Sequence, residues 1–200
     1  MIRFALIAAA AAAVAAPAMA QDAERFNGPF IGGQLGWQQD RQTLTIDGAR
    51  ASNNASGLGY GGQVGYDFRL GGSAVLGLEG AVTGRTGSTD FEDFDLRQGR
   101  TFSATARLGY MVDDNSLLYA RGGWANARFT VEDGADRVSE SRDGFTIGAG
   151  YERYLTNNVS ARIEYNYSDF GSDNLSDVFE TNASIAYRRH AITAGVNFRF

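Results

Sequence analysis

The stretch VSARIEYNYSDF, residues 159–170, alternates between apolar and polar side chains along most of its length. Successive side chains of a β-strand point to opposite faces, so this alternation predicts a strand with one apolar and one polar face. The apolar face holds Val159, Ala161, Ile163, Tyr165 and Tyr167, and the polar face holds Ser160, Arg162, Glu164, Asn166 and Ser168.

Seven further segments repeat this pattern, so the sequence predicts eight strands. Each is about as long as the 9–11 residues that a tilted strand needs to cross a bilayer. The segments are 30–38, 59–69, 74–84, 101–112, 117–125, 145–154, 159–170 and 189–200.

The connections between these segments alternate in length. The short ones, 70–73, 113–116 and 155–158, carry the Gly, Asn, Asp and Ser of tight turns. In outer-membrane barrels short turns lie on the periplasmic side and long loops on the outside, so both chain ends are expected in the periplasm. The predicted fold is an all-β, eight-stranded, antiparallel, up-and-down transmembrane β-barrel. Its long connections are 38–58, 85–100, 126–144 and 171–188.

Residues 1–20, MIRFALIAAAAAAVAAPAMA, have the parts of a secretory signal peptide. Arg3 supplies the positive charge, an apolar run follows, and the small residues at 18–20 predict cleavage between Ala20 and Gln21. The predicted domains are therefore a signal peptide at 1–20, a short periplasmic segment at 21–28 and an outer-membrane barrel at 29–200.

Composition excludes several classes of function. The chain has no cysteine, which excludes disulfides and thiolate metal sites. Its formal net charge of −5 argues against nucleic acid as a partner, because phosphate binding needs a basic surface.

A soluble β-barrel would show the same alternation, and the aromatic residues distinguish the two alternatives. An eight-stranded barrel has an interior only wide enough for side chains, whereas the apolar face here carries many large rings near the strand ends. Such rings are typical of the aromatic girdles of a membrane barrel. They are Trp37, Tyr60, Tyr66, Phe68, Phe102, Tyr110, Trp124, Phe145, Tyr151, Tyr165, Tyr167, Phe198 and Phe200.

The opposite, lumen-facing set contains four acids and four arginines. In so narrow a barrel we expect them to interlock as ion pairs that plug the interior. Paired carboxylates also serve acid/base catalysis, but that chemistry needs a cleft open to substrate. The predicted lumen charge network is Asp67, Glu79, Arg107, Arg121, Glu152, Arg162, Glu164 and Arg199.

GFTIGAGYERYLTNNVSARIEYNYSDFG (144–171) and HAITAGVNFRF (190–200) resemble the small outer-membrane β-barrel proteins of Gram-negative bacteria. Within that group the chain is similar to the porin-like surface proteins of alphaproteobacteria, which share the eight-stranded barrel of the OmpA transmembrane domain. The resemblance implies that the last strand carries the signal read by the barrel-assembly machinery. The matching residues are Ala194, Val196, Phe198 and Phe200.

Two other motifs give weaker evidence for a bound cofactor or metal. Gly57, Gly59 and Gly62 match G-x-G-x-x-G, but a strand follows them where a dinucleotide site needs a helix, so no cofactor is expected. The acidic stretches 90–95, 131–140 and 169–180 suggest Ca²⁺, but none has the EF-hand spacing, so solvated loops are favoured and no metal is expected.

His190 is the only histidine. A catalytic role would need a serine or aspartate partner, and no such motif surrounds it, so no catalytic residue is predicted. Side chains at even and odd positions of a strand face opposite ways. This parity places His190 with Arg188 on the outward face, where the two could contact lipopolysaccharide phosphates.

The sequence thus predicts a non-enzymatic outer-membrane barrel that contributes to envelope integrity and surface contact through four extracellular loops. Its expected partners are outer-membrane lipid and lipopolysaccharide, the barrel-assembly machinery, and host or environmental ligands of the loops. A narrow channel for ions or small solutes is the alternative, and a lipid-modifying enzyme is a third.

Overall fold

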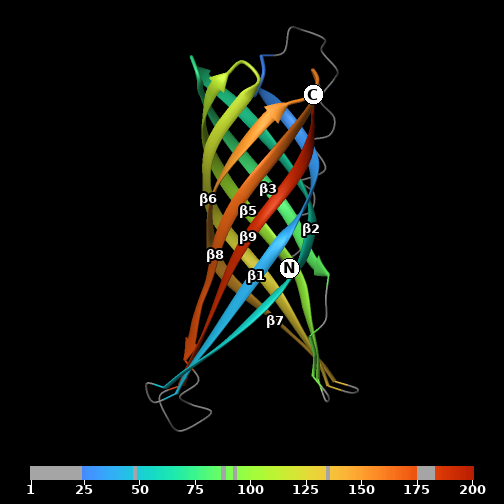
Figure 1. The fold of residues 1–200 in the computed structure, drawn as a ribbon, viewed down its shortest axis with the longest axis vertical. Helices are drawn as coiled ribbons and strands as arrows, with labels where there is room; N and C mark the ends of the chain where they lie inside the picture. The colour runs from blue at the N-terminus through green and yellow to red at the C-terminus, as the bar shows by residue number, and fades with distance from the viewer. Residues whose placement is uncertain (1–23, 47–48, 87–88, 92–93, 134–135, 175–182) are drawn as a thin grey trace, which may run out of the picture.

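A computed structural model describes residues 24–46, 49–86, 89–91, 94–133, 136–174 and 183–200 (Figure 1). The predicted signal peptide, its cleavage position between Ala20 and Gln21, and residues 21–23 lie outside the described residues. No helix in the described part of the chain is long and apolar enough to cross a membrane.

The described chain consists almost entirely of β-strands, eight of them long and one of three residues. The long strands are β1 (Gly28–Ile46), β2 (Ala49–Gly71), β3 (Ala74–Thr86), β5 (Phe94–Asp113), β6 (Ser116–Asp133), β7 (Asp136–Tyr154), β8 (Val159–Asn174) and β9 (Ala183–Arg199), and the short one is β4 (Thr89–Phe91).

The eight long strands close into a barrel in which every neighbouring pair is antiparallel. The order runs from β3 through β2, β1, β9, β8, β7 and β6 to β5, and a further pairing of β3 with β5 completes the circle. The first and last strands seal directly, with Phe30 opposite Arg199. The structure confirms the predicted closed, eight-stranded, up-and-down barrel, which leaves no sheet edge in the membrane.

The chain end and the tight turns lie at one end of the barrel. Asp113 and Ser116 are paired across the β5–β6 turn. Gly71 and Gly72 in the β2–β3 turn have φ of +106° and +53°, a backbone region that favours glycine. The Phe200 amide donates to the carbonyl of Pro29 at 3.2 Å, so the C-terminus is fixed against the first strand. Short turns face the periplasm in outer-membrane barrels, so we expect this end to be the periplasmic one and name it the periplasmic end.

The outward face is apolar and strongly exposed, as a lipid-facing surface must be. Leu108 is 62% exposed and Tyr110 63%, although both lie within a hydrogen-bonded strand. Aromatic rings form a belt at each end of this face. The outer belt contains Trp37, Tyr60, Phe102, Trp124, Phe145 and Tyr165, and the periplasmic belt contains Tyr66, Phe68, Tyr110, Tyr151, Phe198 and Phe200.

The strands continue well past the outer aromatic belt, and here the prediction of long loops is wrong. Much of 38–58, 85–100, 126–144 and 171–188 is strand. β1 alone has 19 residues, where about ten cross a bilayer. Segments such as ASNNASG (51–57) lack apolar alternation, but their backbone groups continue ladders that the barrel has already aligned.

Beyond the membrane the barrel divides into two four-stranded sheets. Among the described residues, the β2–β3 ladder stops at Leu58 and Thr86, and the β7–β8 ladder stops at Phe145 and Asp169. The first sheet has the order β2–β1–β9–β8 and the second β4–β5–β6–β7. We call these two sheets the outer extension.

Candidate functional site

The lumen is the candidate site, because strand alternation directs a large set of charged side chains into it. Seven of the long strands contribute the eight residues predicted from parity, and the structure places all eight inside the barrel. Together with residues that were not predicted, they form three layers stacked along the barrel axis.

The inner layer lies nearest the periplasm and joins Asp67, Arg107, Glu152 and Arg199. Arg107 donates Nε and Nη2 to the two oxygens of Asp67, at 2.9 and 2.5 Å. It also donates Nη1 to Glu152 Oε2 at 3.0 Å. Arg199 bridges the same two acids, with Nη1 2.7 Å from Asp67 Oδ2 and Nη2 2.7 Å from Glu152 Oε1. Two carboxylates and two guanidinium groups therefore balance within one buried ring.

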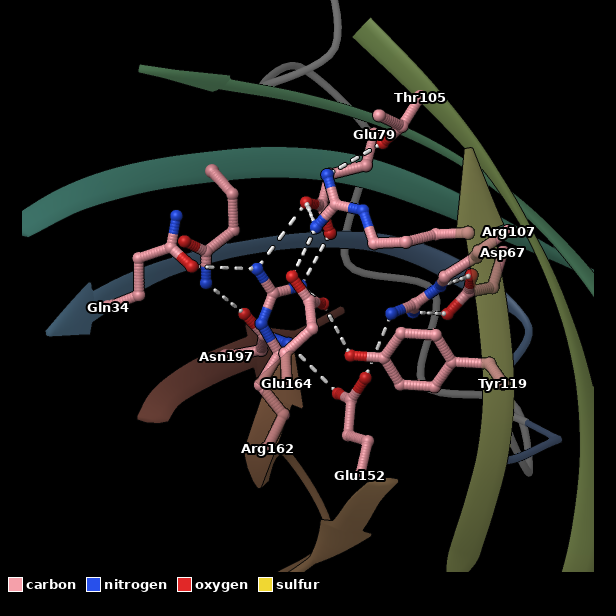
Figure 2. A network of polar contacts seen from close by, with 12 residues as sticks. Gln34, Asp67, Glu79, Thr105, Arg107, Tyr119, Glu152, Arg162, Glu164 and Asn197 are labelled. Atoms are coloured by element: carbon pink, nitrogen blue, oxygen red, sulfur yellow. Dashed lines mark hydrogen bonds and ion pairs between the residues drawn. The ribbon is translucent and has the colours of Figure 1, made fainter. Parts of the chain in front are cut away.

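The middle layer also contains two carboxylates and two guanidinium groups, those of Glu79, Glu164, Arg121 and Arg162. Arg121 Nη1 lies 3.0 Å from Glu79 Oε1 and 2.6 Å from Glu164 Oε1. Arg162 Nη1 lies 2.5 Å from Glu79 Oε2. The Tyr119 hydroxyl donates to Glu164 Oε2 at 2.7 Å. Figure 2 shows Tyr119, Glu164, Arg162 and Glu79 pointing toward one another.

An outer layer, which the sequence analysis missed, joins Asp40, Arg85 and Arg189. Asp40 Oδ2 lies 2.8 Å from Arg85 Nη1, and Asp40 Oδ1 lies 2.7 Å from Arg189 Nε. The predicted first and third strands ended at residues 38 and 84, so Asp40 and Arg85 were assigned to loops. Arg189 lay within a predicted strand, on the lumen face with Thr193, and parity could have identified it.

Neutral polar side chains fill the remaining space between these charges. Ser160 and Asn197 donate to Glu152 Oε1 at 2.5 and 2.9 Å. Gln34 Oε1 accepts from Arg162 Nη2 at 3.3 Å, and Thr105 Oγ1 accepts from Arg121 Nη2 at 2.8 Å. Such bonds matter because a buried charge is costly unless its lone pairs and protons are satisfied.

Apolar and aromatic side chains close the periplasmic end of the lumen, which parity did not anticipate. Phe26 is fully buried and packs edge-on against Tyr154, with ring centroids 4.9 Å apart. The guanidinium carbons of Arg107 and Arg199 lie 4.7 and 4.8 Å from the ring centroid of Phe30. Phe26, which belongs to the described part of the predicted segment 21–28, therefore closes this end of the lumen.

Inward-facing glycines make room for the charged layers. A Cβ built on Gly77 would overlap the Asp67 carboxylate and would lie 2.7 Å from Cγ of Arg107. A Cβ on Gly150 would lie 2.5 Å from the Tyr119 hydroxyl oxygen. These distances are far below van der Waals contact. The large side chains of one strand therefore fit only because the neighbouring strand has glycine at these positions. Gly57, Gly59 and Gly62 all lie within β2 and open no helix.

His190 and Arg188 lie on the outward face, outside this network, as parity predicted. His190 Nδ1 is 2.7 Å from the Tyr165 hydroxyl, and Arg188 Nε lies 3.3 Å from Asp169 Oδ2. Within the described residues, His190 has no serine or aspartate as a hydrogen-bond partner. This placement leaves it without the partners of a hydrolytic site.

The predicted assembly residues Ala194, Val196, Phe198 and Phe200 share the outward face of the last strand and its end. Val196, Phe198 and Phe200 are about half exposed, and the two phenylalanine rings pack at 5.0 Å. For metal ions, the described residues hold no group of three or more acidic or histidine ligands. Many side chains of the acidic stretches 90–95, 131–140 and 169–180 lie outside that description.

Comparison with known proteins assigns the chain to a family. The outer membrane protein β-barrel domain matches residues 6–200. A 22 kDa outer membrane protein of Rhizobium leguminosarum bv. viciae is 31% identical over 144 residues, which cover 71% of this chain and 67% of that protein. The 31 kDa outer-membrane immunogenic protein of Brucella melitensis biotype 1 is 31% identical over 162 residues, covering 73% and 68%.

Solved structures show the same architecture. Ail, the attachment invasion locus protein of Yersinia pestis, superimposes with a TM-score of 0.51 at 18% identity, over 86% of this chain and 99% of that one. Neisserial surface protein A gives a TM-score of 0.50 at 15% identity, over 84% and 97%. The closed barrel, its lipid-facing exterior and these matches lead to one assignment: the chain belongs to the outer membrane protein β-barrel family and is located in the outer membrane of Gram-negative bacteria.

Proposed function

We propose that this protein is a non-enzymatic barrel with a charge-plugged lumen, and that its outer extension makes the contacts of the cell surface. The observation that carries the proposal is the pair of balanced layers across the lumen. Asp67, Glu152 and Glu164 are at most 2% exposed, and Arg107 and Arg162 are each 3% exposed. Side chains thus occupy the space that an ion would need in order to pass.

We expect the plug to be rigid, because separating its buried charges costs free energy. Each inner and middle carboxylate contacts guanidinium groups from two different arginines, so no single side-chain rotation frees a path. Removing one partner would strand a buried charge at a cost of about 3–5 kcal/mol. An eight-stranded barrel offers no room to move such groups aside.

Single-channel recording in planar bilayers tests the plug directly. The wild-type protein is expected to give no stable current. Combining Glu79→Ala/Arg162→Ala in the middle layer with Glu152→Ala/Arg199→Ala in the inner layer and Phe26→Ala in the aromatic seal of the periplasmic end opens space along the axis and removes acids and bases in equal number, so this variant should conduct. Glu79→Ala/Arg162→Ala alone should not, because the inner layer and the seal still close the lumen. Stable current through the wild-type protein would instead favour the narrow channel.

The outer extension is proposed to be the surface-contact element. Relatives of this chain are described as outer-membrane immunogenic proteins, and segments exposed at the cell surface fit that description. The chain has no cysteine, so single cysteines report exposure cleanly. On intact cells, a membrane-impermeant maleimide should label Ser52→Cys in the extension. It should not label Asp114→Cys in the β5–β6 turn, and labelling in the reverse pattern would overturn the orientation.

The proposal assigns no catalytic residue. A lipid-modifying activity would require His190, so altered lipid A in an overexpressing strain, lost on His190→Ala, would contradict this part of the proposal.

A further inference from the structure

The outward face of β2, β1, β9 and β8 changes from apolar to charged over three successive rungs of the ladder. The lowest rung belongs to the outer aromatic belt, the second is polar, and the third begins the outer extension. From the membrane outward, these rungs are Leu58–Trp37–Ile192–Tyr165, Ser56–Gln39–His190–Tyr167 and Asn54–Arg41–Arg188–Asp169.

The third rung places two arginines directly opposite each other. Arg41 pairs with Arg188 across the β1–β9 ladder, and both side chains point outward. Like charges in this position destabilise a sheet unless something neutralises them. Asp169 contacts Arg188 at 3.3 Å, but within the described residues the one bond of Arg41 is from Nε to Asn54 Oδ1, at 3.2 Å. One positive charge of the pair therefore has no acidic partner there.

A surface hollow of about 370 Å³ lies beside this rung. Arg41 and His190 line its outer side, while Trp37 and Ile192 line its membrane side. When the Tyr165 hydroxyl donates to His190 Nδ1, at 2.7 Å, the ring proton resides on Nε2 and is available to an anion. The Arg41 guanidinium and the His190 ring thus lie directly above the apolar side of the hollow, at the membrane surface.

We propose that this hollow binds a phosphate group of lipopolysaccharide, in its lipid A part. Arg41 and His190, which line the hollow, are the phosphate ligands, and Arg188 is a third ligand from beside it, as the cross-strand partner of Arg41. Guanidinium groups bind phosphate through paired, charge-assisted hydrogen bonds. Trp37 and Ile192 share one rung, one below His190 and two below the arginines, and they contact the start of the acyl chains. A ligand with phosphate and acyl chains at this depth matches both halves of the hollow, whereas a free anion matches only the upper half. The site is separate from the lumen and does not depend on the plug.

The test is a titration of the refolded full chain in detergent micelles, with bound lipid counted by native mass spectrometry. The three probes are bisphosphorylated lipid A, the same lipid A after phosphate removal, and inorganic phosphate. The variants are Arg41→Gln, Arg188→Gln and the double variant. Arg153→Gln is the matched control, because Arg153 forms a similar ion pair at the periplasmic end. Its N–O distance to Asp113 is 3.4 Å, against 3.3 Å for Arg188–Asp169, and the two arginine side chains are 51% and 56% exposed.

Arg41→Gln and Arg188→Gln should each weaken binding of phosphorylated lipid A by about tenfold, and Arg153→Gln should leave it unchanged. Lipid A without phosphate should bind the wild-type protein as weakly as phosphorylated lipid A binds the double variant. Equal binding of lipid A with and without phosphate would overturn the proposal, as would an equal loss in Arg153→Gln. Inorganic phosphate binding as tightly as the lipid would show that the acyl contacts contribute nothing and would also overturn it. A heat-dependent gel shift verifies that every variant is folded.

Discussion

Glu152→Gln removes one negative charge from the inner layer while nearly preserving the shape of the side chain. Glu152 is fully buried and receives hydrogen bonds from Arg107 at 3.0 Å and from Arg199 at 2.7 Å. In the variant, the two guanidinium groups share a single carboxylate, that of Asp67. The inner layer then carries a net positive charge that water cannot reach.

The expected loss in free energy of unfolding follows from this burial. Breaking a buried ion pair by removing one partner costs about 3–5 kcal/mol. Glu152→Gln/Arg199→Gln restores neutrality and keeps the bidentate contact of Arg107 with Asp67. The double variant should therefore lose less stability than the sum of the two single variants, by about 1–3 kcal/mol.

Equilibrium urea unfolding of the protein folded in lipid vesicles measures these free energies, with tryptophan fluorescence and the heat-dependent gel shift as probes. Arg153→Gln is the control, because its ion pair is solvent-exposed and such pairs contribute little to stability. A loss below about 1 kcal/mol for Glu152→Gln would refute the reasoning. Additive losses in the double variant would show that the inner layer does not act as one coupled network.

A substitution and a deletion test packing and assembly. Gly77→Ala should destabilise the barrel by about 1–3 kcal/mol in the same unfolding assay, because its Cβ collides with Asp67 and Arg107. Gly80→Ala on the outward face, where the nearest atom is 4.0 Å away, should change stability by less than about 0.5 kcal/mol, and equal losses would argue against crowding. Deletion of Phe200 should lower the amount of heat-modifiable barrel in outer-membrane fractions, because the terminal ring carries the proposed assembly signal. Phe200→Trp keeps an aromatic ring and should assemble. Normal assembly of the truncation would count against that role.

The sequence alone is sufficient to predict the fold and to assign the side chains of each strand to its two faces. Alternation with period two is local, so Arg162 and Glu164 could be assigned to one face and Ile163 to the other without knowledge of their neighbours. The large outward rings, the turn residues and the predicted signal peptide then favoured a membrane barrel over a soluble one. The comparisons confirm that location.

Strand length was harder to predict, because it depends on pairing more than on composition. Residues 49–57 are small and polar, and Arg50 to Gly57 would suit a loop as well as a strand. They are extended because the aligned β1 backbone offers them a continuous set of hydrogen-bond partners. Strand length also explains why the prediction lacks Asp40 and Arg85 of the outer layer, because both lie beyond the predicted strand ends; Arg189 lies within a predicted strand and follows from alternation alone.

Only the tertiary structure decided which charge meets which. Arg162 and Glu79 are 83 positions apart, and Arg199 and Asp67 are 132 apart. Their contact is set by the stagger of strands around the closed barrel, which no local pattern encodes. The sequence by itself determined which side chains enter the lumen or face the lipid, because that choice is made at every residue by the alternation of the strand. The closed register determined the partners, the layers and the pairing of Arg41 with Arg188, because these depend on how distant strands align.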